Sequence, residues 1–193
     1  MCGVHMKVNR GFTITELMMV IAISAILMSL AVPSFENLIR RSAVKKVEED
    51  LFAELIIARS EAISRSRAMS LCPLANPDAN TPACSADVND WNRGWLLFTD
   101  TNRDGAISAA SGNIPEDQIV QFYANRNASK MRLSNTKLSI TYERRGTLKS
   151  GDNSTFLFCD NSIGFKHAII LSPGTGRAYY SDKKSDGSAL ECN

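Results

Sequence analysis

A single carboxylate stands in a long apolar segment near the start of this 193-residue chain. Residues 12 to 35 contain no ionisable side chain other than Glu16, and a run of about 20 apolar residues is enough for a helix to cross a bilayer. An ionised carboxylate inside hydrocarbon costs about 2.5 to 3.5 kcal/mol on insertion scales, so it needs a partner. The sequence therefore predicts a membrane-spanning helix in which Glu16 pairs with a cation.

The residues before this segment suggest what the cation is. Residues 1 to 11 form a short basic stretch that ends in Gly11. A secretory signal is cut after its apolar stretch at small residues, and that kind of site is missing here. A cut between Gly11 and Phe12 would leave the apolar helix on the mature protein. The new α-amino group would then lie one helical turn from Glu16, and we predict that these opposite charges are available to pair.

The stretch GFTITELMMVIAISAILMSLAVPSF, residues 11 to 35, resembles the N-terminus of the type IV pilin-like proteins. Their mark is a basic leader ending in Gly, then Phe, then Glu as the fifth mature residue. The resemblance implies that prepilin peptidase cuts after Gly11 and that the Phe12 nitrogen is methylated. It also implies that Glu16 meets the terminal amine of a neighbouring subunit during fibre assembly. We therefore expect a leader at 1–11 and an assembly helix at 12–35, held in the inner membrane.

A second helical pattern follows Pro33, whose ring is expected to bend the helix. Apolar residues recur at spacings of three and four with charged residues between them, as in an amphipathic helix. This predicts a helix half over 36–67 that packs on another layer. The apolar positions are Val44, Val47, Leu51, Leu55, Ala58 and Ala62.

Beyond residue 70 the pattern changes to short apolar runs separated by Asn, Asp, Gly, Ser and Pro, which indicates strands. The predicted class is α+β, with the long N-terminal helix packed on an antiparallel β-sheet domain over 68–193, placed in the periplasm or outside the cell. Two stretches, 72–93 and 181–193, have the composition of mobile loops. The predicted strands are 94–99, 118–124, 137–142, 155–159, 167–171 and 177–180.

Four cysteines remain once Cys2 is lost with the leader. Disulfides are expected outside the cytoplasm, and four cysteines permit three connectivities. We expect Cys72 to pair with Cys84, closing the loop after the helix, and Cys159 with Cys192, pinning the tail to a strand. A zinc site is the rival interpretation, but the sequence has no C-x-x-C pair and a single histidine beyond the leader.

The stretch DWNRGWLLFTDTNRDGAIS, residues 90 to 108, resembles one branch of the pilin-like proteins, the GspH/FimT type. The later stretches TFLFCDN and IILSPGTGRAYY resemble its closing strand and final hairpin. This resemblance implies a minor pilin that helps to initiate or cap a type IV pilus together with other minor pilins and the major pilin. The alternatives are a GspH-type minor pseudopilin of a type II secretion system and a DNA-binding minor pilin for natural transformation.

Asp100, Asn102 and Asp104 have the spacing of the first half of a calcium loop. The twelfth position of that loop is Ser111, where a bidentate Glu belongs. A turn explains the same residues, because Asp and Asn side chains bond to nearby backbone amides and Gly105 adopts positive φ. We favour the turn and keep calcium as the weaker alternative.

Basic residues are concentrated between positions 125 and 149, although the mature chain has no net charge. Such a segment could hold DNA phosphates, and the alternative is an ordinary solvated surface. DNA receptors of the resembled type carry Gly-Arg-x-Arg, whereas this chain reads Gly176, Arg177, Ala178, Tyr179, so the second Arg is missing. The residues named for DNA contact are Arg144, Arg145 and Arg177, with Lys183 and Lys184 as substitutes.

Catalytic motifs are absent from the sequence: there is no G-x-S-x-G, no P-loop and no H-E-x-x-H. His167, the one histidine beyond the leader, lies in the apolar run HAIIL and is expected to be a structural strand residue. The sequence therefore predicts a structural assembly protein without a cofactor. Its expected partners are prepilin peptidase, other pilin or pseudopilin subunits and the inner membrane.

Overall fold

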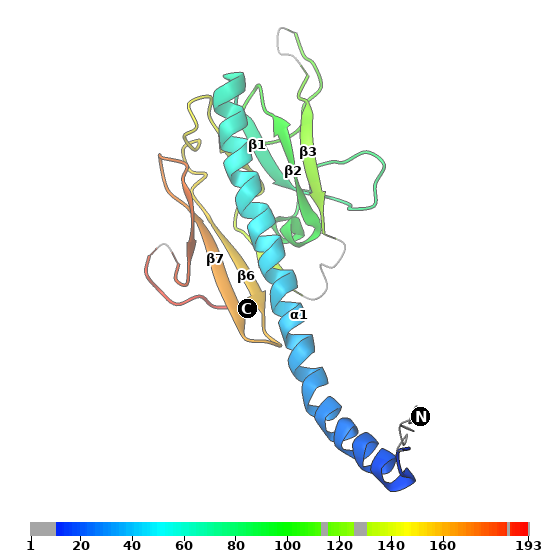
Figure 1. Ribbon diagram of the computed structural model, residues 1–193. Coiled ribbons are helices and arrows are strands. Elements are labelled where there is room, and N and C mark those ends of the chain that lie inside the picture. The colour runs from blue at the N-terminus through cyan, green and yellow to red at the C-terminus, as the bar shows by residue number, and fades with distance from the viewer. Residues whose placement is uncertain (1–10, 113–115, 126–130, 185, 193) are drawn as a thin grey trace, which may run out of the picture. The chain divides into compact units, whose positions relative to one another are not determined.

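The computed structural model describes residues 11–112, 116–125, 131–184 and 186–192, and in residues 30–34 it describes the backbone only. The chain divides into two compact units, residues 1–40 and residues 41–193. Helix α1, Ile14–Arg65, contributes to both (Figure 1).

In the first unit, α1 begins directly after Thr13. The Thr13 hydroxyl accepts a hydrogen bond from the backbone N–H of Glu16 at 3.3 Å, which satisfies one of the free donors of the first turn. Ser24 and Ser29 donate to backbone carbonyls one turn earlier, so their hydroxyls are also satisfied inside the helix. No helix among the described residues has the length and apolarity expected of a membrane span.

In the part of the second unit that the structure describes, the strands form two four-stranded antiparallel sheets. The first has the order β3-β2-β1-β5 and the second the order β4-β6-β7-β8. The first sheet consists of β1 (Met69–Pro73), β2 (Gly94–Thr99), β3 (Ile119–Ala124) and β5 (Ile140–Tyr142). The second consists of β4 (Arg132–Ser134), β6 (Thr155–Asp160), β7 (Phe165–Leu171) and β8 (Ala178–Ser181).

The later part of α1 lies against both sheets (Figure 1). The six apolar positions predicted from spacing are all buried, with exposed fractions between 0% and 8%. They join one core with the inward side chains of both sheets, among them Trp95, Tyr142, Phe156 and Phe158. The prediction of an amphipathic helix packed on antiparallel sheets is therefore confirmed.

Strand β2 is buried along its whole length because it is covered on both faces. Trp95 and Leu97 point into the core shared with α1. Leu96 and Phe98 belong to a second buried cluster with Cys72 and Leu74. Apolar and polar residues therefore do not alternate along β2, because α1 covers one face of this strand and loops cover the other.

Parts of the sequence prediction were wrong in detail. Strands β1 and β4 were not predicted, and β5 is shorter than the predicted 137–142. The stretch 72–93 was predicted as a mobile loop, but it begins inside β1 and ends in a 3₁₀-helix, η1 (Val88–Arg93). The sequence of β1 contains Ser, Cys and Pro and so does not have the apolar pattern of a strand. Only the fold shows that β1 pairs with both β2 and β5.

Helix η1 lies between β1 and β2 in the chain, and its side chains bond to β4 of the second sheet and to the segment that follows β4. The indole Nε1–H of Trp91 donates to the carbonyl of Lys137 at 2.8 Å. The backbone N–H of Leu133 on β4 donates to Oδ1 of Asn92 at 3.2 Å. An edge strand exposes unpaired backbone groups that invite another strand, and Asn92 occupies one of them.

Two disulfides among the described residues link separate segments of the second unit. Cys72 is bonded to Cys84 across 12 residues and Cys159 to Cys192 across 33 residues. These are the two pairs expected from the sequence. The first fixes the loop that follows β1, and the second fixes the C-terminal tail to β6.

Candidate assembly and binding sites

The first candidate site is the N-terminal end of α1. Gly11 and Phe12 are exposed, and Phe12 has 82% of its surface accessible. Glu16 is exposed one turn into the helix, and its carboxylate has no hydrogen-bond or ion-pair partner among the described residues. A carboxylate in the first turn also interacts favourably with the helix dipole. Among the described residues, this end of the helix thus presents a carboxylate without a partner beside an exposed apolar surface.

Apolar side chains surround this end of the helix. From Phe12 to Met28, eleven large apolar residues have exposed fractions between 53% and 82%. A helix that is apolar on every side normally lies in a protein core or a membrane. This segment of α1 therefore carries a broad apolar surface that no other described residue covers. The eleven residues are Phe12, Ile14, Leu17, Met18, Met19, Val20, Ile21, Ile23, Ile26, Leu27 and Met28.

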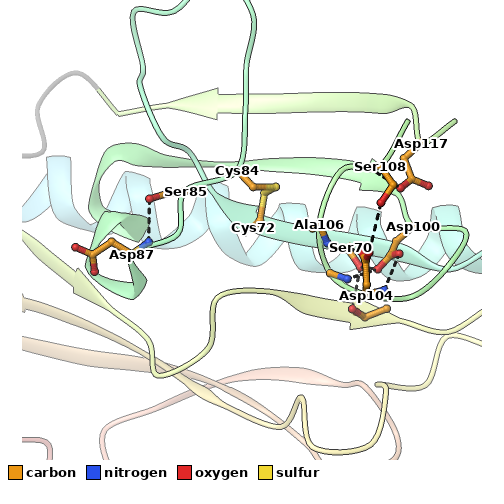
Figure 2. Close-up of a disulfide and its surroundings, with 12 residues drawn as sticks. Ser70, Cys72, Cys84, Ser85, Asp87, Asp100, Asp104, Ala106, Ser108 and Asp117 are labelled. Carbon is orange, nitrogen blue, oxygen red and sulfur yellow. Dashed lines mark hydrogen bonds between the residues drawn. A yellow bond between two sulfur atoms is a disulfide. The ribbon is translucent and has the colours of Figure 1, made fainter. Parts of the chain in front are cut away.

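The second candidate site is the loop between β2 and β3 (Figure 2). Asp100 is fully buried, and its carboxylate accepts from the Ser70 hydroxyl at 2.6 Å and from the backbone N–H groups of Gly105 and Asp104 at 2.9 and 3.2 Å. Ser70 in turn contacts the hydroxyl of Thr141 on β5 at 2.8 Å. Asp100 thus ties the loop to the middle of the first sheet.

Two further acids of the loop accept hydrogen bonds from its own backbone. Asp104 accepts from the N–H of Ala106 at 2.8 Å, and Asp117 accepts from those of Thr101 and Ser108 at 2.9 and 3.0 Å. Gly105 has φ of +80°. This is the turn that the sequence analysis favoured. Among the residues that the structure describes, no group of three His, Cys, Asp or Glu side chains is suited to a metal ion.

Three of the five residues named for DNA contact lie on neighbouring turns. Arg144 and Arg145 are exposed in the turn that ends at Gly146, and Arg177 is exposed directly after Gly176. The two turns touch, because a Cβ added to Gly176 would lie 2.7 Å from the carbonyl oxygen of Gly146.

The two lysines lie elsewhere. Lys183 and Lys184 follow the far end of β8, and Lys184 is paired with Glu191 at 3.9 Å. Of the other basic residues between 125 and 149, Arg132 lies on β4, at the opposite edge of the second sheet from β8. Lys149 Nζ donates to the carbonyl of Arg103 at 2.7 Å. Arg126 and Lys130 lie outside the described residues. The basic residues therefore do not share one surface, and DNA binding stays a prediction.

A polar cluster around His167 was not foreseen. His167 on β7 lies between two carboxylates: Nδ1 contacts Glu48 Oε1 on α1, and Nε2 is 3.3 Å from Asp182 Oδ1. The ring stacks on Tyr180 with centroids 5.8 Å apart. Glu48 is only 2% exposed, and burial raises the pKa of this carboxyl while His167 opposes the rise. His167 is a strand residue, as expected, and it also joins β7 to α1.

Two protein-family models match this chain. The family model for "Type II transport protein GspH" matches residues 49–175, and the model for "Prokaryotic N-terminal methylation motif" matches residues 6–32. No protein with a curated description matched.

Among solved structures, the chain is similar to two crystal forms of the type IV minor pilin FimU of Pseudomonas aeruginosa. The first has 23% identity and a TM-score of 0.49, with 73% of this chain and 90% of that chain covered. The second has 22% identity and a TM-score of 0.47, with 71% and 91% covered.

The helix and sheets, together with the methylation motif, define a type IV pilin-like protein. The chain belongs to the GspH family, since that model covers most of its length. It is a structural subunit of the pilin and pseudopilin class rather than an enzyme.

Proposed function

We propose that the chain is a minor pilin that helps to initiate or cap a type IV pilus. The observation that carries the proposal is the N-terminal end of α1, where the carboxylate of Glu16, which has no partner among the described residues, accompanies eleven exposed apolar side chains. Such a helix is unstable in water by itself, since each exposed apolar residue loses about 1.5–3 kcal/mol of burial. Membrane lipid before assembly, and neighbouring helices afterwards, would supply the covering.

Processing prepares this end for assembly. In the proposed sequence of events, prepilin peptidase removes residues 1–11, the Phe12 amine is freed and methylated, and the amine of one subunit pairs with Glu16 of the next. The match of the methylation motif to residues 6–32 supports this order, because it contains Gly11, Phe12 and Glu16. The unit at 41–193 would then lie on the outside of the fibre or at its tip.

The alternative is a minor pseudopilin of a type II secretion system. The GspH family is named for type II transport, which supports this alternative, and the same N-terminal mechanism would serve both fibres. The two differ in where the mature subunit travels, since a pilus leaves the cell and a pseudopilus stays in the envelope.

Mass spectrometry of sheared surface fibres separates these functions. Peptides of this chain are scored against the most abundant pilin, and a pilus-assembly mutant provides the background. Enrichment in the sheared fraction is the expected result. Mature protein that is retained entirely in the envelope would contradict the pilus and support the pseudopilus.

A further inference from the structure

A small cavity lies between α1, β5 and the turn before β8. It has a volume of about 110 Å³. Leu55, Ile56 and Arg59 of α1 form one wall, and Tyr142 and the Gly176–Ala178 segment form the others. All of these elements belong to the unit at 41–193. A space of this size can hold several waters or one tetrahedral oxyanion.

Tyr142 has a buried hydroxyl without a partner. The side chain is 0% exposed, and Oη makes no hydrogen bond to any described residue. Buried polar groups are nearly always satisfied, so this hydroxyl has an unused capacity to donate a hydrogen bond. Burial raises the pKa of Tyr142 far above its usual value, and nearby Arg59 opposes the rise only in part. The hydroxyl therefore remains protonated and can donate.

The charged groups at this cavity are all cationic. Arg59 uses Nε to donate to the carbonyl of Gly146 at 2.8 Å, and Arg177 is exposed at the rim. Arg144 and Arg145 precede Gly146 in the adjoining turn.

Glu61, two residues after Arg59, and Glu143, directly after Tyr142, already have partners. Glu61 is paired with Arg65, and Glu143 lies 3.6 Å from Arg103. Among the described residues, neither Arg59 nor Arg177 forms an ion pair with a carboxylate. The residues that line the cavity thus include two guanidinium groups, no carboxylate, and a tyrosine whose buried hydroxyl has no partner among the described residues.

We propose that this cavity, called here the Arg59–Arg177 cavity, binds a phosphate-class oxyanion. Arg59 and Arg177 supply guanidinium donors and Tyr142 supplies the hydroxyl donor. The ligand accepts hydrogen bonds only, which matches a site whose side chains only donate. Arg is suited to the task because its planar group pairs with phosphate oxygens. The oxyanion is either a free inorganic ion or the phosphodiester of a polynucleotide.

The test uses the full-length protein in detergent micelles and isothermal titration with inorganic phosphate. Ionic strength is held constant with sodium chloride, so that general screening does not contribute. Two variants remove donors with little effect on folding: Arg177→Gln changes an exposed side chain, and Tyr142→Phe removes only the hydroxyl. Arg132→Gln, an exposed arginine on β4, is the matched control.

Saturable binding is expected, weaker by at least about tenfold in Arg177→Gln and in Tyr142→Phe, because each loses a hydrogen bond to a charged ligand. Arg132→Gln should bind as the unchanged protein does. A parallel titration with a short single-stranded oligonucleotide distinguishes the two sources. If the oligonucleotide binds, if inorganic phosphate displaces it and if both variants weaken its binding, the ligand is the phosphodiester. The proposal is overturned if neither ligand binds, or if both variants bind with undiminished affinity.

Discussion

Gln121 on β3 donates its side-chain amide to both carboxylate oxygens of Glu54 on α1, at 2.7 Å from each. Glu54 is 7% exposed. It has no ion-pair partner among the described residues. Burial raises the pKa of this carboxyl above its ordinary value of 4.5, and the hydrogen bond from Gln121 only partly opposes the rise. The contact between helix and sheet is therefore sensitive to pH.

The sign of this dependence follows from the raised pKa. An acid that binds its proton more tightly in the folded state stabilises that state below about pH 4.5. The contribution is lost as the pH rises through the folded-state pKa. We expect the stability of Glu54→Gln to fall less steeply as the pH rises, and this variant to be at least as stable as the unchanged protein at pH 7. Thermal unfolding between pH 4 and 8 measures the slope and the stability at pH 7, with exposed Glu49→Gln as control. An unchanged pH slope would refute the assignment.

Gly94 should tolerate no side chain. Its φ is +126°, and an added Cβ would lie 2.0 Å from the backbone oxygen of Tyr123 on β3. Gly94→Ala is expected to destabilise the fold by about 3 kcal/mol or more, because backbone strain and overpacking add. Gly151→Ala is the matched control, since φ is +89° but no atom lies within 4 Å, and about 1 kcal/mol is expected. Equal costs in urea unfolding would contradict the packing argument.

The two disulfides should differ in their contribution to stability. Chain entropy predicts a loss of about 4 kcal/mol when the Cys159–Cys192 bridge is removed and about 3 kcal/mol for Cys72–Cys84, because the first closes a longer loop. Paired Cys→Ser variants compared by urea unfolding under oxidising conditions measure the difference. A larger loss for the shorter loop would show that native contacts, rather than chain entropy, decide the order.

Two substitutions separate the charge of Glu16 from its role in capping the helix. Glu16→Ala should leave the subunit inserted in the membrane but lower its incorporation into fibres by at least about tenfold, because the charge pair is lost. Glu16→Gln keeps a side chain suited to the third position of a capped helix and should fail equally. Glu36→Ala, also on α1, serves as control. Normal incorporation of Glu16→Gln would reduce the role of Glu16 to helix capping.

Leader removal is tested at Gly11. Gly11→Asp should block cleavage, so the intact mass should retain residues 1–11, whereas Gly3→Asp should be processed normally. The readout is intact-protein mass spectrometry of membrane extracts. A mature-sized Gly11→Asp product would refute the predicted cleavage site.

The sequence alone determined the features that depend on short spacings. The order Gly11, Phe12, Glu16 defines the N-terminal pattern within six residues, and the three-and-four spacing from Val44 to Ala62 identified the buried face of α1. A helix repeats every 3.6 residues, so its buried side can be read locally.

Only the tertiary structure decided which distant segments meet. Strand β1 lies between β2 and β5, and Arg59, Tyr142 and Arg177 enclose one cavity although they are far apart in the chain. The same holds for the contacts of His167 with Glu48 and of Gln121 with Glu54. Strand order and register arise from the packing of side chains on both faces of each sheet. The spacing of residues along one strand contains no information about which strand becomes its neighbour.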